Sequence, residues 1–149
     1  MKTFLQFEQS YSYALGMYKP IADLNAASGE GQLTKSDLDN VEKYADRLYK
    51  SVGIDVEFTR HFLDRVNDAR NKKQITVAEL IRMFKQSYKK HGKKIAQLGP
   101  DAEAVLNDMQ TDVNMPFVLK WDGKELDLVA KTVMRKKSFA TSNPKLSFK

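Results

Sequence analysis

The stretch 116-PFVLKWDGKELDLVA-130 decides the fold class of this chain. Asp122 and Gly123 lie between two segments in which apolar and polar residues alternate, a pattern typical of antiparallel strands joined by a tight turn. The strands are expected over 116–121 and 125–135, with Leu126, Leu128 and Ala130 on one face. This part of the chain is therefore predicted to form a C-terminal β-hairpin.

Upstream of the hairpin, apolar residues recur at helical spacing. The segments 34-TKSD-37 and 76-TVAE-79 have the pattern of a capping box, in which a Thr is followed three residues later by an acid. They predict helices over 35–51 and 77–91 that end at Gly53 and Gly92. A further helix is expected over 60–68, after Thr59, and a short one over 4–17. Helices followed by strands indicate an α+β fold, with N-terminal helices packed on one face of a small antiparallel sheet.

The 149 residues suit one domain, predicted over 34–149, preceded by an N-terminal arm or short helix plus loop over 1–33. The absence of cysteine excludes disulfides and thiolate metal sites. Asp108 and Asp112 are expected to form turns rather than to bind magnesium. We therefore expect no metal and no cofactor. Apolar runs such as 126–130 are much shorter than the roughly 18 residues of a membrane span, so no membrane partner is expected. The sequence does not define an oligomeric state.

The net charge of +6 is distributed unevenly. Residues 60–94 carry 11 basic and 3 acidic side chains, and residues 131–149 carry 6 basic and no acidic ones. The intervening residues 95–130 carry 2 basic and 7 acidic side chains. If the two basic segments meet in the fold, they form the positive face typical of a polyanion-binding protein. A solvated lysine-rich surface is the alternative.

Candidates for phosphate chemistry lie within these basic segments. Metal-independent cleavage of RNA needs a base for the 2′-hydroxyl proton, cations for the phosphate and an acid for the leaving oxygen. His61 suits proton transfer, Arg65 and Arg135 suit phosphate clamping, and Lys131 with Thr132 would add phosphate contacts. The expected nucleic-acid-binding residues are Arg60, Arg70, Asn71, Lys72, Lys73, Lys136 and Lys137. Alternatively, His61 is an ordinary surface residue and Arg65 pairs with Asp64 or Asp68.

The segments 61-HFLDRVND-68, 75-ITVAEL-80 and 127-DLVAKTVMR-135 resemble an uncharacterised protein of tailed phages. A His-x-x-x-Arg helix, a second helix and then strands with a late Lys, Thr and Arg are similar to the ribonuclease toxins of the barnase, EndoU, colicin and RelE fold group. The resemblance implies a toxin-like fold and an RNA partner, with DNA as the alternative, in the host cytoplasm during infection. Residues 133–135 replace the catalytic aromatic residue or second histidine of many members. Both RNA binding and cleavage by an endoribonuclease therefore remain open.

The first eight residues, 1-MKTFLQFE-8, resemble the capsid-targeting leader of internal head proteins in T-even-type phages. This resemblance implies a different function, that of a non-enzymatic phage structural or internal head protein. Its basic faces would then neutralise packaged nucleic acid in the virion. The competing interpretation of these residues is a short amphipathic helix that packs Phe4 and Phe7 on the core.

Overall fold

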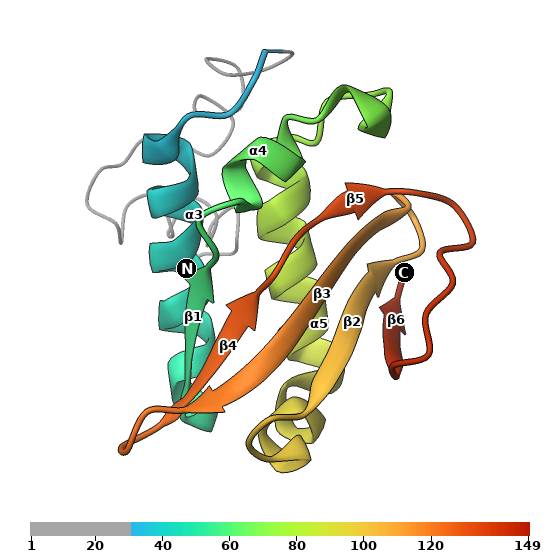
Figure 1. Cartoon of the computed structure of the whole chain (residues 1–149). Helices are drawn as coiled ribbons and strands as arrows, with labels where there is room; N and C mark the ends of the chain where they lie inside the picture. Colours follow the sequence, from blue (N-terminus) through green and yellow to red (C-terminus); the bar gives the residue numbers. More distant parts are fainter. Residues whose placement is uncertain (1–30) are drawn as a thin grey trace.

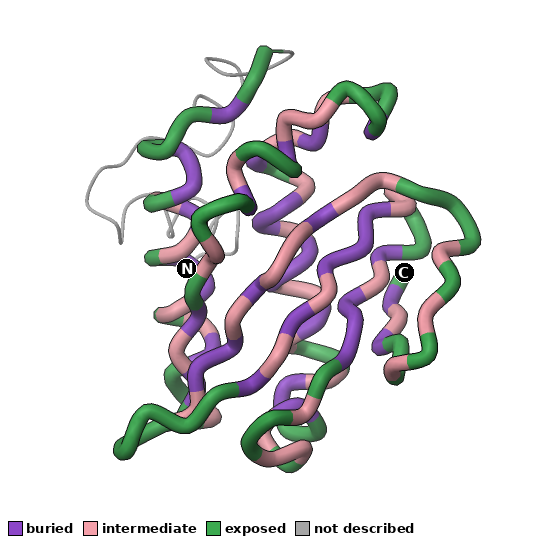
Figure 2. The backbone as a smooth tube through the Cα atoms, in the orientation of Figure 1, coloured by how far each residue is buried: buried purple, intermediate pink, exposed green. Residues whose placement is uncertain are grey.

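The computed structural model describes residues 31–149 (Figure 1). The helix predicted over 4–17 and most of the predicted arm lie outside the described residues. The described chain is α+β, and helices α3 (Lys35–Tyr49) and α5 (Val77–Leu98) pack against one face of a six-stranded sheet. Buried side chains of the two helices and the sheet form one hydrophobic core (Figure 2).

The sheet is mixed, whereas the sequence predicted an antiparallel one. Its strands are β1 (Ile54–Phe58), β2 (Glu103–Asp108), β3 (Val113–Trp121), β4 (Leu126–Ala130), β5 (Met134–Arg135) and β6 (Lys145–Phe148). They lie in the order β1-β4-β3-β2-β6, with β5 paired to β3. β1 pairs in parallel with β4, and β6 in parallel with β2. The antiparallel pair β3–β4 is therefore internal to the sheet, and the chain ends in β6 rather than in a hairpin.

Both predicted capping boxes are confirmed. The Thr34 side chain accepts a hydrogen bond from the Asp37 backbone at 3.1 Å, and the Asp37 carboxylate accepts one from the Thr34 backbone at 2.9 Å. Thr76 and Glu79 make the same reciprocal pair at 3.1 and 3.0 Å. After α3 the chain makes one 3₁₀ turn (Lys50–Val52) and leaves it at Gly53, whose φ of 75° suits glycine.

The helix predicted over 60–68 is wrong in its extent. Only α4 (Phe62–Val66) is α-helical there, followed by the 3₁₀ helix η2 (Ala69–Asn71). Thr59 does not cap α4, because the N-cap residue is His61 and no side chain within residues 31–149 bonds to the first turn. The Thr59 backbone N–H instead bonds to the Ala130 carbonyl at 3.2 Å and extends the β1–β4 pairing. The Thr59 hydroxyl donates to the Lys131 carbonyl at 2.9 Å. The start of α4 is thereby held against the end of β4.

Helix α5 continues past Gly92, where the sequence predicted its end, and runs to Leu98. Gly92 is buried inside the helix, and a Cβ there would lie 3.0 Å from a ring carbon of Tyr88. This glycine makes room for an aromatic ring rather than ending the helix. Ile95, one turn further, is fully buried and keeps the last turns on the core.

The cap of α5 gives the first testable prediction. Thr76→Ala removes the hydroxyl that accepts from the Glu79 backbone and should lower the free energy of unfolding by about 1 kcal/mol. Thr76→Ser keeps the acceptor and should recover most of that stability. Urea denaturation monitored by circular dichroism measures both variants. Equal stability of Thr76→Ala and the parent chain would contradict a stabilising cap.

Candidate functional site

Residues 61–73 and 131–137, from the two basic segments, border one pocket with a volume of about 930 Å³. Lys89, Lys90, Lys93 and Lys94, from the rest of the first basic segment, line a separate pocket of about 580 Å³. The larger pocket is the one described below. Its lining includes eight basic and two acidic side chains, so its charge is strongly positive. The lining residues are His61, Arg65, Asp68, Arg70, Asn71, Lys72, Lys73, Asp112, Lys131, Thr132, Val133, Met134, Arg135, Lys136 and Lys137. All of the predicted site residues except Arg60 are among them.

The pocket forms because α4 and the end of β4 are held together. β1 leads directly into His61 and α4, while β4 leads into Lys131 and Thr132. The parallel pairing of β1 with β4 delivers both chain segments to the same end of the sheet. The two bonds from Thr59 to Ala130 and Lys131 fix their separation.

His61 and Arg65 lie one helical turn apart, and both are exposed. The Arg65 backbone N–H bonds to the His61 carbonyl at 3.1 Å. Neither side chain makes a hydrogen bond or ion pair with another described residue. The same holds for Lys72 and Lys73, which are exposed beyond η2. The guanidinium of Arg65 and the ammonium groups of Lys72 and Lys73 are therefore available to an anionic ligand.

Arg135 is engaged within the protein. Its guanidinium donates to both carboxylate oxygens of Glu79, at 2.7 and 3.0 Å. It also donates to the backbone carbonyls of Thr111 at 2.9 Å, Gln74 at 3.0 Å and Lys73 at 3.3 Å. Because all five of its N–H donors can be satisfied in this way, the phosphate-clamp role expected for Arg135 has no free donor to support it.

Asn71 is also a structural residue. It is buried, its amide group donates to the Arg65 carbonyl at 3.0 Å, and its oxygen accepts from the Arg135 backbone at 2.9 Å. The side chain thus joins the end of α4 to β5. Its role is to hold the two walls of the pocket together.

Two further cations of the pocket carry carboxylate partners. Arg70 pairs with Asp68 at 2.8 Å, and its hydrogen bonds lower the pKa of Asp68 to about 2. Lys131 pairs with Glu103 at 2.7 Å and, through that hydrogen bond, lowers the pKa of Glu103. Arg70 and Lys131 are themselves 77% and 40% exposed, so both pairs can be exchanged for phosphate contacts at small cost.

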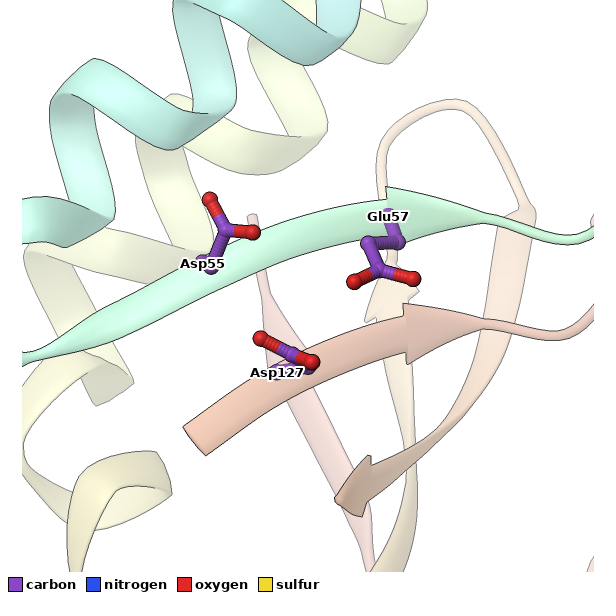
Figure 3. A group of neighbouring side chains, drawn as sticks. All are labelled: Asp55, Glu57 and Asp127. Atoms are coloured by element: carbon purple, nitrogen blue, oxygen red, sulfur yellow. The ribbon is translucent and has the colours of Figure 1, made fainter. Parts of the chain in front are cut away.

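A second group of charged residues lies on the sheet face opposite the helices. Asp55 and Glu57 on β1 and Asp127 on β4 project from the same side of two paired strands (Figure 3). One carboxylate oxygen from each lies within 4.8 Å of the others. Burial raises the pKa of Asp127 to about 6, and the charges of Glu57 and Asp122 add to the effect. Among the described residues, this group and the overlapping set Asp122, Glu125 and Asp127 are close enough to hold a metal ion.

The acidic group extends to the free edge of β1. Asp46 on α3 accepts a 2.6 Å hydrogen bond from the backbone N–H of Val56. This bond satisfies an N–H at the outer edge of β1, where no neighbouring strand of the described chain is paired. Burial is the main cause of a pKa of about 7 for Asp46, and Asp55 raises it further. This group was not predicted from the sequence, because β1 was not predicted. The available signal was the alternation 54-IDVEF-58, in which acids occupy the outward positions.

The magnesium ligands considered from the sequence, Asp108 and Asp112, do not form such a group. Asp108 is fully buried and pairs with Arg82 at 2.8 Å. It also accepts a hydrogen bond from the Gln110 backbone at 2.9 Å. Its role is therefore to join α5 to the turn after β2.

Comparisons of the chain with protein-family models, curated proteins and solved structures found no match. Within residues 31–149, no helix is long and apolar enough to cross a bilayer.

Arg135 provides a test that separates structural from ligand-binding cations. Arg135→Ala should lower the free energy of unfolding by about 3 kcal/mol, because it leaves the Glu79 carboxylate, which is only 16% exposed, without its cationic partner. Arg135→Lys should recover little, since an ammonium cannot reproduce the planar fork. Arg65→Ala is the control and should change stability by less than about 0.5 kcal/mol. Equal effects of the two alanine variants in urea denaturation would mean that Arg135 is not a structural residue.

Proposed function

We propose that this protein binds single-stranded RNA in the pocket between α4 and residues 131–137. The observation that carries the proposal is the meeting of two basic segments, about 60 residues apart in sequence, around one pocket of about 930 Å³. Several cations there have no partner among the described residues, which is the state expected for a surface that binds phosphates.

The concave shape favours a single strand over a duplex. A pocket of this size can receive a splayed nucleotide, whereas the bases of a duplex are paired and stacked and cannot enter it. Lys72 and Lys73 line the pocket from the segment after α4, and Lys136 and Lys137 line it from the segment after β5. A strand that enters the pocket therefore meets cations from two segments of the chain, and these can contact successive phosphates.

The pocket also supports one reaction on RNA, metal-independent endonucleolytic cleavage. The 2′-hydroxyl attacks the adjacent phosphorus and gives up its proton to His61, and the 5′-oxygen leaves with a proton from water. The products are a 2′,3′-cyclic phosphate and a 5′-hydroxyl. Arg65, whose guanidinium has no hydrogen-bond partner among the described residues, stabilises the charge that builds on the phosphate. Lys131 and Thr132 line the same pocket and supply the further phosphate contacts.

Binding is tested by reversing charge on each of the two segments separately. Lys72→Glu with Lys73→Glu, and Lys136→Glu with Lys137→Glu, should each weaken binding of a labelled RNA oligonucleotide in fluorescence anisotropy. The dependence of log K on log salt should become shallower by about 0.7 for each phosphate that the variant no longer neutralises.

The matched control is Lys93→Glu with Lys94→Glu, which changes the net charge equally on exposed residues of α5 that line the separate, lysine-lined pocket of about 580 Å³. These residues lie about 21 Å along the helix from Glu79, whose carboxylate binds Arg135 in the pocket wall. The control should bind RNA nearly as well as the parent chain. Weaker binding from reversal of one segment only would contradict a shared pocket. Tighter binding of duplex DNA than of RNA would favour nucleic-acid neutralisation instead.

Cleavage is tested by incubating the protein with mixed-sequence RNA in excess EDTA. We expect products with cyclic-phosphate ends, absent from His61→Ala and strongly reduced in Arg65→Ala, since a positioned acid or base contributes roughly 10²- to 10⁴-fold. Both variants should keep the parent unfolding midpoint, because neither side chain has a hydrogen-bond partner among the described residues. Intact RNA with unchanged affinity would remove the reaction and leave binding as the function.

A further inference from the structure

We infer that Asp55, Glu57 and Asp127 form a binding site for a hydrated divalent cation of the Mg²⁺ type. The three carboxylates come from neighbouring positions on two paired strands, and one oxygen of each lies within 4.8 Å of the others (Figure 3). This inference does not depend on the function proposed for the basic pocket, which lies at the ends of these strands.

One carboxylate oxygen of Asp127 lacks a hydrogen-bond donor or cation among the described residues. Asp127 is only 8% exposed, and its Oδ1 is buried without a hydrogen-bond partner within residues 31–149. Its carboxylate faces those of Asp55 and Glu57 across the strand pair (Figure 3). A buried carboxylate oxygen with no donor is costly, and a cation between the three carboxylates would remove that cost.

No protein cation fills this role in the described part of the chain. None of the three carboxylates takes part in a described ion pair. Lys120 faces Asp127 in the strand register, but its ammonium lies 3.3 Å from Asp101. The other charges that act on Asp127 are carboxylates, including that of Asp122. The local field is therefore negative and favours a bound cation.

The donor set selects the class of cation. All three ligands are carboxylate oxygens, which hard cations such as Mg²⁺, Mn²⁺ and Ca²⁺ prefer over nitrogen- or sulfur-seeking metals. Glu57 is exposed and Asp55 is half-buried, so water can complete the coordination sphere. Few protein ligands together with several waters suit Mg²⁺ better than Ca²⁺, which takes six to eight oxygen ligands.

The test uses the full chain after EDTA treatment and dialysis. MgCl₂ should raise the unfolding midpoint above the value in NaCl of equal ionic strength. MnCl₂ should quench the fluorescence of Trp121 saturably, because this single tryptophan lies next to Lys120, the strand partner of Asp127. Asp127→Asn and Glu57→Gln should each weaken Mn²⁺ binding by at least the ~10-fold that removal of a supporting group commonly costs.

Asp64→Asn is the matched control, since it removes one charge from an exposed carboxylate on α4 that has no described ion pair. It should keep the response of the parent chain to both salts. Identical midpoints in MgCl₂ and NaCl, together with no saturable quenching, would overturn the inference and mean that the carboxylates share protons instead. Cation responses that survive in both Asp127→Asn and Glu57→Gln would overturn it as well, because the site would lie elsewhere.

Discussion

The ion pair between Arg135 and Glu79 is the constraint on which the arrangement of the pocket depends. Glu79 belongs to the capping box of α5, and Arg135 belongs to β5, so the pair joins the start of the long helix to the sheet. Bonds from the same guanidinium to Lys73, Gln74 and Thr111 carbonyls add the loop before α5 and the turn before β3. Because Arg135 makes all of these bonds, it holds in place the chain segments that carry the unpaired cations of the pocket.

Much of the fold could be predicted from local sequence. Both capping boxes and the alternation in β3 and β4 depend on residues within a few positions of one another, and these features are present. The parallel edge strands could not be predicted, because β1 finds its partner some 70 residues later and β6 pairs with a strand about 40 residues earlier. The predicted end of α5 at Gly92 was wrong for a similar reason. Gly92 makes room for the ring of Tyr88 inside the helix and does not end it.

The pocket, too, has features that local sequence predicts and features that depend on contacts between distant residues. Charge distribution predicted which segments carry cations, and the structure brings residues 61–73 and 131–137 to one pocket, whereas Lys89, Lys90, Lys93 and Lys94 line another. The sequence could not distinguish a cation that binds a ligand from one that holds the fold, because Arg65 and Arg135 differ only in their partners in space. Asp55, Glu57 and Asp127 were missed because their proximity arises from the parallel register of β1 and β4.

The pairing of β1 with β4 also gives the molecule an electrical polarity. Carboxylates occupy the outer face of these strands, and cations follow directly at Lys131, about 13 Å beyond Asp127 along β4. An approaching polyanion is repelled at one end of this strip and attracted at the other. An RNA strand bound as proposed would therefore leave the pocket away from the sheet face, so its path over the protein would be restricted by repulsion as well as by attraction.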